Sequence, residues 1–180
     1  MMETSSIFRT SNMDYIKKIC GKKLSDIFLQ PVAGLISDVD MFVINFGESN
    51  EISLHVFCFL RITCGSRILL TSTDMHFGEN YEWLTYDEQD NARHKCFEKT
   101  LLNKNIGNLK RILEDAYVLN ACFSEIGDII IEFDNSVIIE IRVDALYNDF
   151  ECYRIILGRG ETAEHHVITC SNGTLMYSKE

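Results

Sequence analysis

The segment DIIIEFDNSVIIEIRV, residues 128–143, decides the fold class because it reads as two strands around a short loop. With residues 134–136 as the loop, the strands pair Phe133 with Val137, Ile131 with Ile139 and Ile129 with Ile141. The opposite face then receives Glu132, Glu140 and Arg142. One apolar and one polar face is the pattern of an antiparallel sheet with one buried side.

The same period of two recurs along most of the chain, interrupted by turn residues. Segments expected to be extended are 22–36, 40–46, 52–63, 66–74, 117–124, 128–133, 137–143, 151–157 and 165–170. Helical spacing and capping residues predict a short N-terminal helix over 11–21 and a longer one over 87–107, which Gly107 would end. The apolar stripe of the longer helix consists of Ala92, Cys96, Phe97, Leu101 and Leu102. The sequence therefore predicts an α+β fold, mostly antiparallel sheet with about eight or nine strands.

The bulk properties indicate one domain over residues 1–180, with residues 1–11 disordered. The seven cysteines are odd in number, form no C-x-x-C pair and fall mostly in apolar runs, so we expect free thiols in a reducing compartment. The N-terminus has no apolar signal region, and no apolar run is long enough to span a membrane. These features favour a cytoplasmic protein without membrane contact.

The net charge of −10 is unevenly distributed. Residues 114–151 contain ten acids and one base, and residues 74–98 contain seven acids and two bases. Such a surface repels a phosphate backbone, which disfavours nucleic-acid binding. It permits a basic protein partner, although acidity also serves solubility alone.

The stretch EISLHVFCFLRI, residues 51–62, carries a histidine and an arginine inside an apolar run. Its even-numbered residues are all apolar and predict a core face. His55 and Arg61 are both odd-numbered, so on one straight strand they share the other face. Six residues at ~3.3 Å separate them by about 20 Å, too far to act on the same bond.

The neighbours of His55 follow from the expected turns. A loop over residues 47–51 pairs His55 with Val43, and a turn at residues 64–65 pairs Arg61 with Ile68 and His55 with Asp74. His55 beside Asp74 resembles part of a catalytic triad, but no nucleophile stands in a strand-to-helix elbow. One interpretation is a hydrogen-bonded structural histidine, with Arg61 stacked on Phe59. The other is a ligand or peptide groove.

Residues 76–86 contain the only tryptophan, Trp83, together with Tyr81 and Tyr86. Tryptophan and tyrosine are favoured anchors of protein interfaces, although this loop could also close one end of the sheet. Residues 128–143 add Glu132 and Glu140 as acidic candidates for partner contact.

Two histidine-containing motifs give weak metal signals. One holds His94 and Cys96, and the other holds His165 and His166. In each motif the two side chains point to different faces, so we expect no metal site. No nucleotide-binding or metalloprotease motif is present, and no cofactor is expected.

The stretch FGESNEISLHVFCFLRI, residues 46–62, resembles a family of small uncharacterised bacterial proteins through its Leu-His-x-x-Cys-x-x-Arg-Ile strand. The similarity extends loosely over residues 22–170. The chain departs from the family at Leu60, where tryptophan is usual, and at Ser136, where glycine is usual. The resemblance implies a bacterial source and a binding role like that of immunity partners of toxins, and no catalytic residues.

These observations favour a non-enzymatic acidic protein-binding domain, an immunity or antitoxin-like inhibitor of a basic toxin domain. The alternative is a small-molecule-binding or enzymatic domain that uses the face of His55, Asp74 and Arg61. A third possibility is a homodimer formed through uncovered sheet edges.

Overall fold

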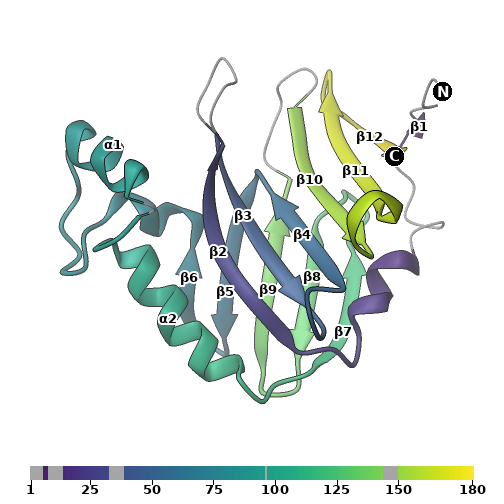
Figure 1. Cartoon of the computed structure of the whole chain (residues 1–180), viewed down its shortest axis with the longest axis horizontal. Coiled ribbons are helices and arrows are strands. Elements are labelled where there is room, and N and C mark those ends of the chain that lie inside the picture. Colours follow the sequence, from purple (N-terminus) through teal and green to yellow (C-terminus); the bar gives the residue numbers. More distant parts are fainter. Residues whose placement is uncertain (1–5, 8–13, 33–38, 96, 144–149) are drawn as a thin grey trace.

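The structure is a computed structural model that describes residues 6–7, 14–32, 39–95, 97–143 and 150–180. Within these residues the strands form two antiparallel sheets, one behind the other in Figure 1. Two α-helices and three short 3-10 helices accompany the sheets. The predicted α+β class is therefore confirmed.

One sheet has seven strands, and each strand is antiparallel to its neighbours. In spatial order they are β1 (Ser6–Ile7), β12 (Thr174–Lys179), β11 (Glu164–Ser171), β10 (Phe150–Leu157), β4 (Ile52–Val56), β3 (Val39–Phe46) and β2 (Leu24–Val32).

The other sheet has five strands. In spatial order they are β6 (Arg67–Thr71), β5 (Phe59–Cys64), β9 (Val137–Arg142), β8 (Ile129–Phe133) and β7 (Val118–Phe123). The β8–β9 hairpin has the predicted register, with Ile129 opposite Ile141 and Ile131 opposite Ile139. All four of these isoleucines are buried.

The segment 52–63, predicted as one strand, is two strands that belong to different sheets. β4 ends at Val56 and β5 begins at Phe59, and between them the Phe57 amide donates to the Cys152 carbonyl at 3.0 Å. β4 pairs with β10 in the seven-stranded sheet, and β5 pairs with β9 in the five-stranded sheet. The strand turns this corner because apolar faces of both sheets pack on the same core.

The predicted alternation of burial survives this bend. All six even-numbered side chains of residues 52–62 are buried, and the odd-numbered ones are partly exposed. The same side of the chain thus faces the core in both sheets. One continuous apolar cluster fills the space between them, with Ile44 and Leu54 from one sheet and Leu60 and Ile139 from the other.

The helical elements are η2 (Asp14–Ile19), η3 (Ser72–His76), α1 (Tyr86–His94), α2 (Leu101–Leu113) and η4 (Gly160–Thr162). α2 packs against β2 and β6, which are edge strands of the two sheets (Figure 1). η2 packs against β7, the other edge of the five-stranded sheet. Three of the four edge strands, β2, β6 and β7, are therefore flanked by helices. The sequence had left these edges open for dimer formation.

The predicted single helix over residues 87–107 is wrong, because the structure has two helices there. The first, α1, ends at His94, and α2 begins at Leu101 after Thr100, whose Oγ1 accepts from the Asn103 amide at 3.3 Å. Gly107 does not end a helix, since α2 continues to Leu113.

The apolar stripe predicted for that helix is nevertheless buried. Ala92, Phe97, Leu101 and Leu102 all lie in the core. Cys96, the remaining member of the stripe, lies outside the described residues.

The turn between β5 and β6 also differs from the prediction. Cys64 pairs with Arg67, so Gly65 and Ser66 form the turn, and the positive φ of 56° at Gly65 suits glycine. A register irregularity follows between Ile62 and Thr63. The predicted pairing of Arg61 with Ile68 is therefore wrong, and Arg61 lies opposite Thr71.

The strand count was underestimated, because twelve strands are described where eight or nine were expected. Part of the excess comes from the division of 52–63, and part from β12, which the sequence analysis did not identify. Of residues 1–11, expected to be disordered, Ser6 and Ile7 pair with β12 and the others lie outside the described residues.

None of the six described cysteines forms a disulfide bond. None of the described helices has the length and apolar character needed to cross a lipid bilayer.

Candidate functional site

His55 lies on β4, on the outer face of the seven-stranded sheet. Its partner on β3 is Val43, as predicted, and its partner on β10 is Arg154. The predicted neighbour Asp74 lies in η3, outside this sheet, so the pairing of His55 with Asp74 is wrong. That pairing depended on one unbroken strand across residues 52–63.

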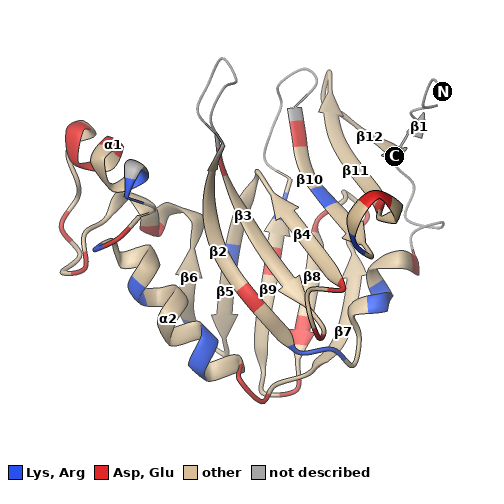
Figure 2. Ribbon diagram, in the orientation of Figure 1, with Lys and Arg blue, Asp and Glu red and all other residues tan. Residues whose placement is uncertain are grey.

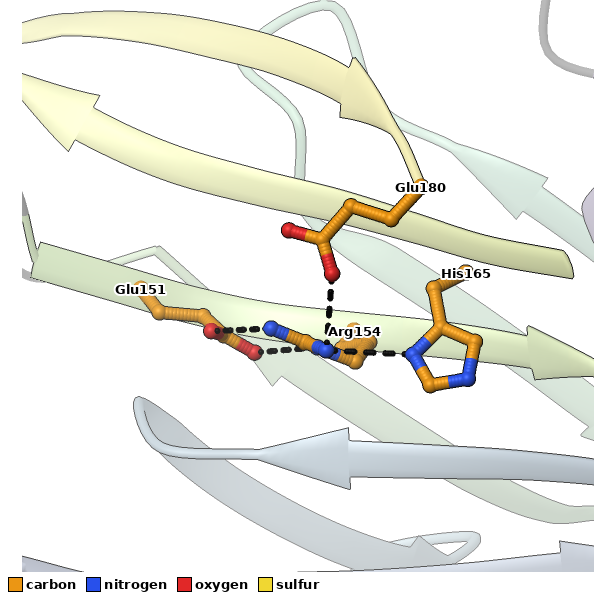
Figure 3. A network of polar contacts seen from close by, with 4 residues as sticks. All are labelled: Glu151, Arg154, His165 and Glu180. Carbon is orange, nitrogen blue, oxygen red and sulfur yellow. Dashed lines mark hydrogen bonds and ion pairs between the residues drawn. The ribbon is translucent and has the colours of Figure 1, made fainter. Parts of the chain in front are cut away.

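Arg154 is the centre of a polar network on this face (Figure 3). Its guanidinium donates two hydrogen bonds of 3.0 Å to the Glu151 carboxylate. Its Nη1 also lies 3.1 Å from His165 Nδ1 and 3.1 Å from a carboxylate oxygen of Glu180. This network ties β10, β11 and the end of β12 together.

Burial lowers the pKa of His55, and the positive charge of Arg154 lowers it further. His55 is therefore neutral at pH 7. Since Arg154 is occupied by two carboxylates and an imidazole, the network resembles a structural cross-link. The interpretation of His55 as a histidine placed by the fold is the one this geometry favours.

Arg61 lies on β5, in the five-stranded sheet, and not beside His55. Its Nε and Nη2 each lie 2.7 Å from Glu140, its cross-strand partner on β9. Glu140 also pairs with Arg142 at 2.7 Å. The hydrogen bond from Arg61 lowers the pKa of Glu140. Arg61 is thus part of an ion-pair cluster, where stacking on Phe59 was predicted.

Asp74 has a structural role at the start of η3. Its carboxylate accepts from the Thr71 amide at 3.2 Å and from the Thr71 hydroxyl at 2.9 Å. It also accepts from Asn105 of α2 at 2.8 Å. Asp74 therefore joins η3 to α2. His55, Arg61 and Asp74 do not form a common face.

Several acidic side chains of residues 114–151 form ion pairs or hydrogen bonds that stabilise the fold. Asp115 pairs with Lys23, Asp128 accepts from the Val143 amide, and Asp134 accepts from the Tyr117 amide. Glu132, a candidate for partner contact, accepts from Asn120 at 3.2 Å. The most acidic stretch of the sequence is therefore largely engaged with its own chain.

A different surface gathers exposed aromatic and acidic side chains. Residues 76–90, here called the aromatic–acidic lobe, include Tyr81, Trp83 and Tyr86, which are 68%, 64% and 84% exposed. Five acids in the lobe are also exposed: Glu79, Glu82, Asp87, Glu88 and Asp90. Figure 2 shows acidic segments concentrated on α1 and the loop before it.

The backbone of the loop that begins the lobe, residues 76–84, is held by hydrogen bonds. Within it, Phe77 and Trp83 form an antiparallel bridge, and the Leu84 amide donates to the His76 carbonyl at 3.0 Å. Towards α2, the Leu101 amide donates to the Phe77 carbonyl at 2.8 Å. Tyr81 and Trp83 thus lie in a loop with a hydrogen-bonded backbone, and Tyr86 begins α1 directly after it.

The side chain of Trp83 is itself packed on two rings. It stacks on His76, with ring centroids 5.7 Å apart, and meets Phe77 edge to face at 5.0 Å. Gln89 Nε2 donates to the Leu84 carbonyl at 2.7 Å, so Gln89 Oε1 accepts from His76 Nδ1 at 2.9 Å. His76 therefore carries its proton on Nδ1, and its ring orientation is fixed.

Tyr81 has a similar support from α2. Lys104 Nζ lies 5.5 Å from the centre of the Tyr81 ring and donates to the Glu79 carbonyl at 3.1 Å. This cation–π contact keeps an exposed ring in place at low entropic cost.

Thr85 begins α1 through a capping box. The Glu88 amide donates to Thr85 Oγ1 at 3.4 Å, and the Thr85 amide donates to the Glu88 carboxylate at 2.8 Å. The bonds that the Thr85 amide and the Thr85 hydroxyl donate to the Glu88 carboxylate lower the pKa of Glu88. Thr-x-x-Glu is a recognised sequence signature of a helix start, and it would have placed this boundary correctly.

Backbone strain concentrates around the lobe. Tyr81, Phe97 and Lys99 have positive φ angles of 67°, 60° and 61°. The other non-glycine residues described with positive φ are Ser49, Asn50, Ser136 and Asn172, small polar residues for which this conformation is less unusual. Strained backbone at large side chains is enriched at functional sites.

A cavity of about 260 Å³ lies beside the lobe, and its lining includes His76, Tyr86 and Asp90. Asp40 from β3 and Arg93 from α1, which form an ion pair at 2.9 Å, also line it. Neither residue was identified from the sequence, because β3 and α1 meet only in the fold.

The histidine pair 165–166 divides between two environments, as predicted. His165 faces outward toward Arg154, whereas His166 is buried, stacks on Tyr15 at 4.0 Å and lies 2.9 Å from the Tyr177 hydroxyl. The other motif includes Cys96, which lies outside the described residues. Across the described ranges, no group of three or more His, Cys, Asp or Glu side chains is arranged to hold a metal.

No family model, curated protein or solved structure matches this chain.

Proposed function

We propose that this chain is a non-enzymatic protein-binding domain whose aromatic–acidic lobe contacts a basic partner. The observation that carries the proposal is the exposure of Tyr81, Trp83 and Tyr86 on one ordered segment. Binding hot spots are enriched in tryptophan and tyrosine. The rings of Tyr81 and Trp83 are already held by contacts within the chain, so they lose little conformational entropy on binding.

The charge around these rings supports a basic partner. Five exposed carboxylates lie within residues 76–90, and no lysine or arginine occurs in that range. A partner with a positive surface would be steered toward the lobe, and a nucleic acid would be repelled.

The finer proposal is an immunity or antitoxin-like role, in which the partner is a basic toxin domain. It is supported by the acidity of the lobe and by the resemblance carried by residues 54–62. A toxin gene directly beside this one would agree with it. Direct support would be loss of the partner's toxicity when the two proteins are produced together.

The test is affinity capture from a lysate of the source organism on three immobilised forms of the chain. These are the wild type, the lobe variant Trp83→Ala/Tyr86→Ala, and the control variant Leu119→Ala/Ile126→Ala. Leu119 and Ile126 are 66% and 70% exposed on and beside β7, so the control removes comparable apolar surface elsewhere.

We expect a basic protein to be retained by the wild type and the control and lost by the lobe variant. Its affinity for the lobe variant should be at least ~10-fold weaker, since hot-spot truncations cost ≥ 2 kcal/mol. Retention by the lobe variant, or capture of acidic proteins alone, would exclude the lobe as the binding surface.

The enzymatic alternative has less support. His55 lies on β4, Arg61 on β5 and Asp74 in η3, so the three do not meet. Arg61 is also ion-paired with Glu140, and Asp74 accepts a hydrogen bond from the Thr71 hydroxyl.

A further inference from the structure

We propose that two copies of this chain form a two-fold symmetric dimer in which the lobe of each copy docks on the β6–α2 groove of the other. This groove is a cavity of about 310 Å³ between β6 and α2, and its lining includes Arg67, Ile68, Tyr81, Asn108 and Ile112. The inference goes beyond the proposed function, because it requires no protein other than a second copy of the chain.

The groove offers exposed apolar side chains to a partner. Ile68, near the start of β6, is 64% exposed, and Ile112, near the end of α2, is 43% exposed. The lobe offers the exposed rings of Tyr81, Trp83 and Tyr86. Burial of these isoleucines against such rings removes apolar surface of both copies from water, which favours association.

The arginines at the groove lack a carboxylate partner. Arg67 lines the groove, and Arg111 donates to Asn108, another lining residue. Within the described part of the chain, neither arginine forms an ion pair. Asp74 also lines the groove, but it lies beyond the far end of β6, about 13 Å from Arg67 at ~3.3 Å per residue, and its carboxylate already accepts three hydrogen bonds.

The lobe has carboxylates that lack a cation. Glu79 and Asp87 are exposed, and among the described residues neither has an ion-pair partner. No lysine or arginine occurs in residues 76–90, and no acid occurs in α2. The aromatic and acidic lobe of one copy therefore complements the aliphatic and basic groove of another.

α2 separates the two complementary surfaces within one copy. Lys104, whose Nζ lies over the Tyr81 ring of the lobe, is near the start of α2, and Ile112 is eight residues later on the same face. This spacing corresponds to about 12 Å along the axis. Figure 1 shows α1 near the start of α2 and away from its end. A two-fold axis across the middle of α2 therefore brings each lobe to the far end of the other groove, and such a contact closes after two copies.

Sedimentation velocity of the full chain measures this association. We expect a monomer–dimer equilibrium with a dissociation constant of ~1–100 μM, in the range of small, transient interfaces. The groove-reversal variant Arg67→Glu/Arg111→Glu and the lobe-reversal variant Glu79→Lys/Asp87→Lys should each dimerise at least tenfold more weakly. The neutral variant Arg67→Gln/Arg111→Gln, a milder change to the fold, should dimerise at least fivefold more weakly.

The control variant reverses two cations elsewhere. Lys18 and Arg159 are exposed, and in the described ranges neither forms an ion pair. Lys18→Glu/Arg159→Glu changes the net charge by the same amount as groove reversal and should dimerise like the wild type. This control separates loss of the contact from general repulsion between more acidic chains.

An equimolar mixture of the two reversal variants tests the pairing itself. In a mixed dimer one contact joins an unaltered lobe to an unaltered groove, and the other joins a reversed lobe to a reversed groove. Both contacts are then attractive, so the mixture should dimerise although each variant alone does not. Recovery of the dimer also verifies that both variants are folded.

The inference is overturned if the wild type stays monomeric, if the reversal variants alone dimerise like the wild type, or if their mixture does not dimerise although both are folded by thermal unfolding. Oligomers that keep growing with concentration also overturn it, because a two-fold contact closes. If the dimer forms as expected but Trp83→Ala/Tyr86→Ala still captures every partner, only the proposed function fails. If that variant loses the partner while the wild type is a monomer, only this inference fails.

Discussion

His55 has a positively charged neighbour, and this determines how the protein responds to acid. Burial and Arg154 lower its pKa below the usual value near 6.5, while Glu151 opposes them and His165 adds to them. Below about pH 6.5 the unfolded chain therefore binds a proton that the folded protein resists. The free energy of unfolding falls as the pH drops through this window.

We expect urea unfolding to show lower stability at pH 5.5 than at pH 7.5. Part of the difference should disappear in His55→Phe, which cannot be protonated. His166, whose pKa burial also lowers, accounts for a further part and remains in the variant. Identical pH dependence in the variant and the wild type would show that His55 contributes nothing. The variant should keep its partner, since His55 lies outside the lobe.

For individual residues, burial was predictable from the sequence, whereas the identity of neighbouring residues was not. Parity alone identified the buried side of residues 52–62, because a sheet face alternates whichever sheet the strand belongs to. The partner of His55 on β3 follows from a short local loop. Its partner Arg154 comes from a strand distant in sequence, and no local pattern in a single sequence specifies such a pairing.

In the link between α1 and α2, backbone conformations disagree most with the preferences of the residues that adopt them. Lys99 is exposed and has a φ of 61°, a conformation that costs a residue with a Cβ roughly 1–2 kcal/mol. Glycine adopts it without this cost but loses more entropy on folding. Because the strain that is relieved exceeds the additional entropy loss, we expect Lys99→Gly to raise the free energy of unfolding by about 0.5–1 kcal/mol.

Equilibrium unfolding in urea measures this change. The control is Lys95→Gly, an exposed position four residues earlier with an ordinary φ of −102°, where glycine should destabilise the protein. If Lys99→Gly is as destabilising as the control, then the positive φ carries no strain.

At the element scale, the hairpin β8–β9 was predictable to the residue because its loop is short and its faces differ in polarity. The division of residues 52–63 into β4 and β5 was not predictable, since the apolar alternation continues through the bend at residues 57–58. The two helices were merged because their apolar positions continue across residues 95–100, although Thr85 and Thr100 both marked helix starts. The cavity of the candidate site depends on this division, and so it escaped sequence analysis.

The charge of the whole molecule makes its association with a basic partner sensitive to salt. The chain carries −10, and the lobe concentrates negative charge at one end (Figure 2). Raising the ionic strength from 0.1 M to 1 M shortens the Debye length from ~10 Å to ~3 Å. We expect the association rate constant to fall at least ~10-fold, while the dissociation rate constant changes less.

Stopped-flow mixing with the captured partner, followed by Trp83 fluorescence, measures both rates. A salt-independent association rate would mean that the acidity of the lobe serves another purpose. The class of fold and the acidity of the surface were both readable from composition and pattern. The sequence did not show which acids remain available to a partner, because neutralisation by neighbouring side chains arises only in the folded chain.

The corner at residues 57–58 has a consequence for the way this chain is made on the ribosome. β4 can complete its pairing only with β10, and β5 only with β9, both of which are synthesised much later. A nascent chain that ends before them exposes two apolar sheet faces and the edges that β9 and β10 will occupy. Long-range pairing of this kind folds slowly, so the emerging protein depends on chaperones or rapid completion to avoid aggregation.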